Sequence, residues 1–487
     1  MKRFIALIIS VLCALFLASC GMAEQFAQIS DQIKNGIIDA AGQFIEKNTE
    51  TDFSDDTDES FSESISDSDT GSDEPDLPPP EYEIYERPLI PLGNFVGFNI
   101  RKMEGNTDDY TSLEYKHKDL LGSGRFNYLL VGENDIDIPL TYFKMCATKS
   151  NVYLSYDLAN VKNDGTGELN FYEYSSKVLD FASKYCAQNS YMSNVRRVEI
   201  GRSPDMKISA SEYALLLNTI YDGNCKAMGE TYGLTFLNRE ARLITGTMSS
   251  FNLTYLSELM DEIDALRDDE YLPVGGWSFD ISSMGASPEV AFLNNSGLNS
   301  ILNYRNTYYN GIELYLNVMG WDTVDNTSEC YVSQKGDYSS EQMQAMYMLR
   351  SLLILYSMDV DNVAFSTFID TSANGTGIIK SDGTNKVAYD VLTAFKGLTK
   401  NVYLDEIIAN GENGTYIYSF TNNDGKTVYA LWTADGSSTA SLSLSGDVIV
   451  TSYNLDNNAY QSEAIECNGE SVDFTASEMV TFVTVNE

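Results

Sequence analysis

Histidine is almost absent from this sequence of 487 residues, which contains a single one, His117. A Ser-His-Asp triad needs a positioned imidazole and zinc sites often use several, so both chemistries are effectively excluded. Basic residues are also scarce: 31 Lys and Arg stand against 71 Asp and Glu, for a formal net charge of −40. Because nucleic-acid phosphates require patches of Lys and Arg, we expect no nucleic-acid partner.

Neither the cysteines nor the glycine-rich segments of the sequence indicate a metal or cofactor site. Beyond residue 20 the cysteines are odd in number, widely scattered and without a C-x-x-C pair, which indicates neither a zinc site nor a disulfide framework. They are Cys146, Cys186, Cys225, Cys330 and Cys467. The segment Gly122-Ser123-Gly124 lacks the Lys and Ser or Thr of a phosphate-binding loop. We therefore expect no metal and no cofactor.

The first residues have the features of a targeting segment. Lys2 and Arg3 precede an apolar run, 4–17, that is shorter than the roughly 20 residues of a membrane span. Leu17-Ala18-Ser19-Cys20 resembles a bacterial lipobox, which implies a signal peptide over 1–19 and a lipid on Cys20. An ordinary secretory signal cut elsewhere is the alternative. Two acyl chains anchor a protein stably, so we expect an extracytoplasmic lipoprotein on a bacterial membrane, at the cell surface.

An acidic segment follows the lipidated Cys and a possible helix within 20–50. Residues 50–87 contain fifteen Asp or Glu and one basic residue, Arg87. Such a composition buries too little apolar surface to offset chain entropy, so we predict a Ser-rich disordered linker over 51–87.

Alternating strand and helix patterns occupy 88–400. Apolar periodicity at helical spacing is clear after Leu253 and after Met343, and Ser339 with Gln342 matches a capping box. Eight strand and helix units predict an α/β fold of the (β/α)8 TIM barrel type. The expected strands are 94–100, 127–132, 152–158, 195–200, 241–246, 274–281, 312–319 and 362–369.

Helical periodicity is missing from 401–487. Strand patterns at 415–420, 428–433, 440–444, 448–455 and 479–485 are joined by turn sequences such as Asn423-Asp424-Gly425. We predict a small antiparallel β-sandwich there.

One stretch points to a family. Residues 195–205 read V-R-R-V-E-I-G-R-S-P-D and resemble the E-I-G-N-E-P-D signature of the clan A glycoside hydrolases, whose barrel and following sandwich match the expected architecture. In that signature the Glu after Asn is the acid/base; here Arg202 and Ser203 occupy the pair. Residues 312–323, aligned on Gly320 and Trp321, place Val318 at the expected nucleophile.

Hydrolysis with retention needs two carboxyl groups about 5 Å apart, so the resemblance implies a degenerate site. Glu199 and Glu313 lie further back in their strands and are not expected to substitute. Side chains at or after the strand ends are the candidate ligand contacts, because barrel sites form at that face. They are Asn99, Arg101, Asp157, Arg202, Asp205, Trp277, Asp280, Asn317, Trp321, Asp322 and Asp370. Arg202 is expected to pair with a cleft Asp, and Asp205 equally suits a helix cap.

Three functions remain open. The first, which we favour, is a catalytically degenerate glycosidase-like lipoprotein (a pseudoenzyme) that binds an oligo- or polysaccharide in the barrel cleft. The second is an active glycoside hydrolase that uses the displaced carboxylates Asp205, Asp280 and Asp322. The third is a surface scaffold with a protein partner.

Overall fold

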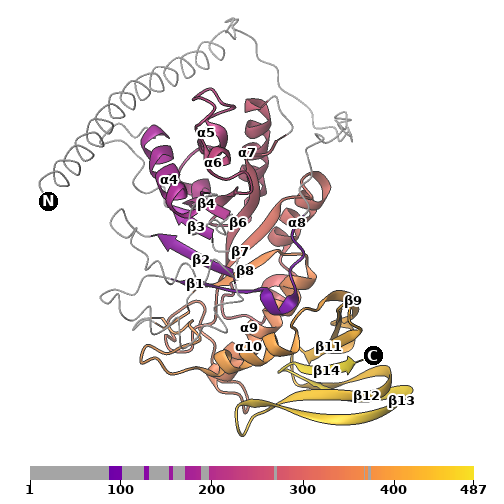
Figure 1. Ribbon diagram of the computed structural model, residues 1–487. Helices are drawn as coiled ribbons and strands as arrows, with labels where there is room; N and C mark the ends of the chain where they lie inside the picture. Colours follow the sequence, from indigo (N-terminus) through magenta and orange to yellow (C-terminus); the bar gives the residue numbers. More distant parts are fainter. Residues whose placement is uncertain are drawn as a thin grey trace, which may run out of the picture. The chain divides into compact units, whose positions relative to one another are not determined.

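Figure 1 shows a computed structural model of the chain, which describes residues 87–100, 125–130, 153–156, 171–187, 197–267, 271–366, 368–370 and 374–486. The elements below belong to one compact unit, Glu81–Asp222 with Gly233–Glu487. The predicted signal peptide, Cys20 and the acidic linker up to residue 86 lie outside the described residues. Within those residues, no helix has the length and apolar character of a membrane span.

Eight parallel strands close into a barrel in chain order. The closing pair is β1 with β8, in which Val96 lies opposite Val363 and Phe98 opposite Phe365. The predicted (β/α)8 barrel is thus confirmed. The strands are β1 Val96–Ile100, β2 Arg125–Leu130, β3 Tyr153–Tyr156, β4 Arg197–Arg202, β5 Arg242–Thr247, β6 Val274–Ser282, β7 Glu313–Met319 and β8 Asn362–Phe365.

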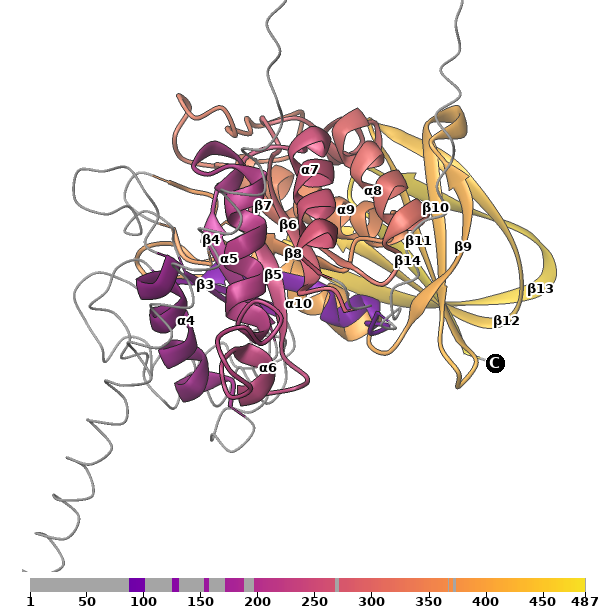
Figure 2. The same cartoon turned by 90° about the horizontal axis from the view of Figure 1, so that it is seen from above.

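Among the described residues, helices follow the strands from β3 onward and pack on the outside of the barrel, as the view in Figure 2 shows. Asn252 begins α7 by accepting a hydrogen bond from the amide of Tyr255, and Ser339 and Gln342 form the predicted capping box of α9. These caps satisfy first-turn amides that have no partner within the helix. The helices are α4 Phe171–Tyr185, α5 Ala210–Asp222, α6 Leu234–Leu237, α7 Leu253–Leu266, α8 Ser296–Tyr308, α9 Ser340–Ser357 and α10 Val387–Leu398.

Side chains on β6 and β7 alternate between an apolar outer face and a polar inner face. On β7, Leu316 and Val318 belong to the main hydrophobic core, so the intervening Asn317 faces the barrel interior. The same alternation turns Ser278 and Asp280 of β6 inward. Barrel interiors are usually filled by branched aliphatic side chains, so a polar inner face is unusual.

Four charged residues at the barrel's N-terminal end form what we call the Arg87 clamp: Arg87, Arg305, Asp359 and Asp361. Arg87 donates to Asp359 at 2.7 Å and to Asp361 at 3.0 Å, and the fully buried Arg305 donates to the same carboxylates at 2.6 and 3.0 Å. Both aspartates precede β8, so the clamp holds the entering chain at the end of the barrel opposite the strands' carboxyl ends. Burial of Asp361 raises the pKa of its carboxyl to about 6, although both guanidinium groups oppose that shift.

After α10 the chain forms a six-stranded antiparallel sheet in the order β13-β12-β14-β11-β10-β9. Tyr418 and Trp432 pack into the barrel's core, whereas Ile417 and Leu431 on the opposite face pack in a second core with the first half of β12. The long β12–β13 hairpin therefore makes the second layer of the expected sandwich. The strands are β9 Tyr403–Asn410, β10 Thr415–Thr421, β11 Lys426–Thr433, β12 Ser437–Asn454, β13 Ala459–Ser477 and β14 Thr481–Asn486.

A buried ion pair joins the sheet to the barrel. Arg350 of α9, fully buried, donates to Glu289 at 2.7 Å, and the indole N–H of Trp432 donates to the same carboxylate at 2.9 Å. A buried guanidinium is tolerated only when it is paired and hydrogen-bonded, so these contacts fix the sheet against the barrel.

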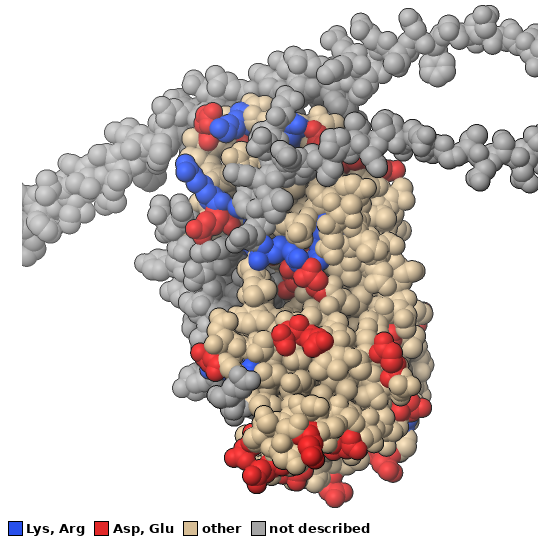
Figure 3. All heavy atoms as spheres, turned by 90° about the vertical axis from the view of Figure 1, so that its right-hand side faces the viewer, with Lys and Arg blue, Asp and Glu red and all other residues tan. Residues whose placement is uncertain are grey.

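The sheet carries most of its exposed charge as acid. No lysine or arginine follows Lys426 in the sequence, and the exposed acids of β12 and β13 include Asp447, Glu463, Glu466 and Glu470. Acidic side chains gather at the lower end of the face seen in Figure 3. Long exposed strands with like charges resist pairing with other chains.

Candidate functional site

Five inward side chains meet in the C-terminal half of the barrel, and we call them the polar floor: Glu199 of β4, Thr247 of β5, Ser278 and Asp280 of β6, and Asn317 of β7. They come from four adjacent strands, and Asp280 lies directly opposite Asn317 in the β6–β7 register. Thr247, Ser278, Glu199 and Asn317 are all at least 95 % buried.

Thr247 is the centre of the floor's hydrogen bonds. Its hydroxyl lies 3.0 Å from that of Ser278, accepts from the Asn317 amide at 2.6 Å, and donates to Glu199. A hydroxyl has one proton and two lone pairs. Because the one hydroxyl proton of Thr247 is used in the hydrogen bond to Glu199, Ser278 must be the donor in its hydrogen bond with Thr247. The hydroxyl protons of the floor therefore all point toward the Glu199 carboxyl.

Glu199 is only half satisfied. Its Oε1 accepts from the Thr247 amide at 2.8 Å as well as from the hydroxyl, but its buried Oε2 has no hydrogen-bond partner. Burial raises the pKa of this carboxyl to about 8; the Thr247 bonds oppose the rise and the charge of Asp280 adds to it. At neutral pH Glu199 therefore carries a proton and can donate a hydrogen bond.

Above the floor, the end of β4 carries Arg202 and Ser203, from the stretch that resembles the clan A signature. Ser203 has left-handed backbone angles, φ 50°, and its amide donates to the carbonyl of Thr247 at 2.7 Å. Arg202 is exposed and forms no ion pair with any residue in the described ranges, so the expected pairing with a cleft Asp is not present there. Asp205 accepts from the amide of Ser249 at 3.0 Å and from its hydroxyl at 2.6 Å, which ties the β4 and β5 loops together rather than capping a helix.

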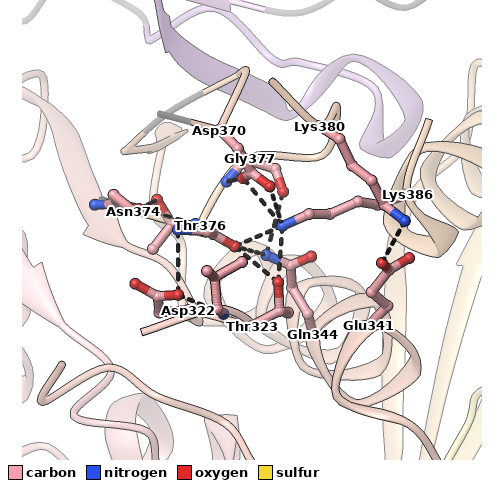
Figure 4. Close-up of polar contacts among 12 residues, drawn as sticks. Asp322, Thr323, Glu341, Gln344, Asp370, Asn374, Thr376, Gly377, Lys380 and Lys386 are labelled. Carbon is pink, nitrogen blue, oxygen red and sulfur yellow. Dashed lines mark hydrogen bonds and ion pairs between the residues drawn. The ribbon is translucent and has the colours of Figure 1, made fainter. Parts of the chain in front are cut away.

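The loops after β7 and β8 are held by a second cluster, which we call the β7–β8 lock: Asp322, Gln344, Asp370, Gly375 and Lys386. Figure 4 shows Asp322, Gln344, Asp370 and Lys386 of this cluster. Lys386 lies 2.8 Å from Asp370 and donates to the carbonyl of Gly375 at 2.6 Å, with both ionic side chains almost fully buried. Desolvation raises the pKa of Asp370 and lowers that of Lys386, against the effect of their pairing.

Asp322 completes the lock by accepting backbone amides. Its Oδ1 accepts from Val324 at 2.8 Å, from Asp325 at 2.9 Å and from Gly375 at 3.1 Å, while Gln344 donates to the Gly375 carbonyl at 3.1 Å. Through these hydrogen bonds the Asp322 carboxylate holds two loops together. Asp322 is 1 % exposed.

Several predicted contacts lie away from the floor. Val318 is fully buried in the main core on the outer face of β7, so its side chain does not stand at the mouth. Trp277 is likewise buried and packs against Tyr304 and Tyr309 around α8. Trp321 is fully buried and donates to the carbonyl of Ala286 at 2.9 Å. The alternation of strand side chains explains the first two placements.

Three other predicted contact residues have no described side chain. Arg101 and Asp157 lie beyond the described residues, and Asn99 is described only by its backbone in β1. Of the predicted residues, Asp280 and Asn317 belong to the floor. Among the described residues, no group of three or more His, Cys, Asp and Glu is arranged to hold a metal ion.

Sequence reasoning set aside Glu199 and did not single out Thr247 or Ser278. A usable signal was present: Glu199 stands between the apolar Val198 and Ile200, and strand alternation turns it into the barrel. Glu313, also set aside, pairs with Arg197 and Tyr315 on the inner face at the start of β7, away from the mouth.

Comparison with solved structures shows a glycoside hydrolase-like fold. A family 39 glycoside hydrolase from the gut symbiont Bacteroides cellulosilyticus is similar over 82% of this chain and 83% of its own, with 14% identity and a TM-score of 0.58. A family 30 endoxylanase from Clostridium papyrosolvens covers 83% of this chain and 98% of its own, with 13% identity and a TM-score of 0.55.

A glucosidase from Croceicoccus marinus is similar over 82% of this chain and 98% of its own, with 11% identity and a TM-score of 0.56. The sequence itself matches no protein-family model and no curated protein. The structure is thus similar to clan A glycoside hydrolases in its barrel and its C-terminal antiparallel sheet. At these identities the likeness establishes the fold alone.

Proposed function

We propose that this chain binds carbohydrate at the barrel mouth without cleaving it. The observation that carries the proposal is the polar floor, in which a buried hydroxyl, an amide and a carboxyl with one unpartnered oxygen converge at the end of the barrel where ligands bind. Directional donors and acceptors of this kind suit sugar hydroxyls.

We propose that cleavage is absent because one expected carboxyl group is replaced and two others are engaged in hydrogen bonds to the backbone. Ser203 occupies the acid/base position of the signature, and a hydroxyl does not protonate a leaving oxygen as a carboxylic acid does. Asp205 and Asp322 hold loops through hydrogen bonds to backbone amides. Neither is therefore available as the partner that hydrolysis requires.

A glycan array probed with the full chain tests this function. We expect binding to a subset of glycans, and Asn317→Ala should weaken it because a buried amide of the floor is lost, whereas Asn303→Ala on the exposed face of α8 should leave it unchanged. The proposal fails if no glycan is bound or if both variants bind as the natural chain does.

One observation favours an active glycoside hydrolase as a second candidate. Glu199 and Asp280 interact electrostatically, which gives one protonated and one ionisable carboxyl at the floor. Hydrolysis of aryl glycosides by the purified chain, lost in Asp280→Asn and in Glu199→Gln but kept in Asp205→Asn, would establish this candidate in place of the first.

We also propose that the chain is anchored through Cys20 to the outer face of a bacterial membrane. The support is the sequence: a short apolar run ending in the lipobox-like Leu17-Ala18-Ser19-Cys20. Cys20→Ser should move the chain from the membrane fraction to the soluble fraction, and retention of the variant on the membrane would contradict the proposal.

A further inference from the structure

Arg202, the last residue of β4, carries a positive charge at the barrel mouth that no described residue neutralises. Most other arginines whose side chains the structure describes are engaged, either in ion pairs or with backbone carbonyls. They are Arg87, Arg197, Arg267, Arg305 and Arg350, with ion pairs, and Arg242, with carbonyls. In a chain with 71 acidic and 31 basic residues, an arginine without an acidic partner at the mouth requires an explanation.

The backbone of β4 turns Arg202 toward the polar floor. Strict alternation from Glu199, which faces the barrel interior, would place Arg202 on the outer face. Gly201 breaks the alternation with a left-handed φ of 84°, and Arg202 is then paired in register with Thr247, whose hydroxyl belongs to the floor. Burial is the main cause of the raised pKa of Glu199, and the charge of Arg202 opposes that rise, so the guanidinium is within electrostatic range of the floor.

Ser203 adds a second donor beside Arg202. It is half-buried, and its hydroxyl makes no hydrogen bond to a described residue. The clan A signature that this stretch resembles has Asn and Glu at these two positions. This chain has therefore gained a positive charge at one position and lost a carboxyl group at the other, and both differences favour an anionic group at the mouth.

We propose that the glycan bound at the mouth carries a carboxylate, as uronic acids do, and that Arg202 binds this group. The inference rests on the proposed carbohydrate-binding function and names its ligand class. A guanidinium presents two parallel N–H donors that match the two oxygens of a planar carboxylate. Because Arg202 is exposed, a carboxylate reaches it from solvent without entering the buried floor. The net charge of −40 opposes any general attraction of anions, so a preference for acidic glycans would report this local contact.

Calorimetric titration of the full chain with acidic oligosaccharides and their methyl esters tests the inference. The pairs are tetragalacturonate, tetramannuronate and tetraglucuronate, each with its fully methyl-esterified form, which keeps the sugar rings and removes the charge. Tricarballylate serves as a carboxylate without sugar. We expect the acid of the preferred pair to bind about tenfold tighter than its ester, the effect of one hydrogen-bonded pair of charged groups.

Variants of Arg202 assign the preference to its guanidinium. Arg202→Gln should reduce the ratio of acid to ester affinity to about twofold or less, because the charged donor is lost. Arg202→Lys keeps the charge without the two parallel donors and should retain a ratio of about threefold. Arg239→Gln is the matched control, because Arg239 is exposed, forms no ion pair with a described residue and precedes β5 at the other end of the barrel, and it should keep the full ratio.

Equal binding of acids and esters by the natural chain overturns the inference but leaves carbohydrate binding standing, as does an acid preference that survives Arg202→Gln. Tricarballylate that binds as tightly as the preferred acid also overturns it, because the site would then recognise a carboxylate without its sugar. A chain that binds none of the pairs but binds other glycans on the array contradicts this inference alone. A chain that also fails on the array contradicts both proposals.

Discussion

The β7–β8 lock and the polar floor lie at the same end of one barrel, yet they treat their carboxyl groups in opposite ways. In the lock, Asp370 is paired with Lys386 and Asp322 accepts three backbone amides. In the floor, Glu199 keeps one buried oxygen without a partner. The lock also contains one buried atom without a partner, Oε1 of Gln344, so the contrast concerns the carboxyl groups alone. Buried carboxyl oxygens are normally satisfied, which is why the proposed ligand contact is assigned to the floor and a structural role to the lock.

The largest effect is expected from breaking the lock. Lys386→Met leaves Asp370 buried without its cation, and we expect the free energy of unfolding to fall by about 3–5 kcal/mol in chemical denaturation. Lys380→Met is the matched control, because Lys380 pairs with Glu341 at the surface, and it should cost less than about 1 kcal/mol. Equal losses for the two variants would show that the lock does not hold the loops.

A smaller effect sharpens the account of the floor through its pH dependence. The folded pKa of Glu199, about 8, is raised above the unfolded value, so its contribution to stability is fully present below the unfolded pKa and is lost as pH rises toward 8. The glutamine side chain of Glu199→Gln cannot ionise. The free energy of unfolding of this variant, relative to that of the natural chain, should therefore rise by on the order of 3 kcal/mol as the pH is raised from 5 to 8. Unfolding measured at both pH values checks this.

If the difference in unfolding free energy between Glu199→Gln and the natural chain is the same at pH 5 and pH 8, the pKa of Glu199 is not raised in the folded protein. Glu470→Gln, an exposed acid on β13, serves as the comparison, and its stability should follow that of the natural chain at both pH values.

The smallest effect concerns the backbone at the edge of the floor. Ser203 has a left-handed φ of 50°, which glycine adopts without strain, so Ser203→Gly should stabilise the chain by about 0.5 kcal/mol after the entropy cost of glycine is subtracted. Ser203→Ala retains the strain and should give no gain. A thermal unfolding midpoint that rises for Ala as much as for Gly would trace the effect to the hydroxyl instead.

Much of the architecture could be predicted from the sequence because strand and helix periodicity is strong where one face packs on a core. The strands expected at 241–246 and 274–281 begin and end within one residue of β5 and β6. The strands β9 and β13 were not predicted. Both lie at the edges of the sheet, where most side chains are exposed and the apolar alternation that marks a strand is absent.

The floor was harder to predict than the barrel. Matching Val318 to a family position by its neighbours ignores which face of β7 it occupies, and the buried Val318 shows that one residue of register decides whether a side chain meets ligand or core. Glu199 was discounted for its depth in β4. Its side chain nevertheless bonds to Thr247, the last residue of β5, a reach that linear spacing does not reveal.

The Arg87 clamp has a consequence for the layout of the barrel. Because the guanidinium of Arg87 is bound to Asp361, which directly precedes the first residue of β8, this part of the chain joins the barrel at the N-terminal ends of the strands. The polar floor lies toward the opposite ends of the strands, so the point of entry and the floor are separated along the barrel axis and a substitution at one leaves the contacts of the other in place.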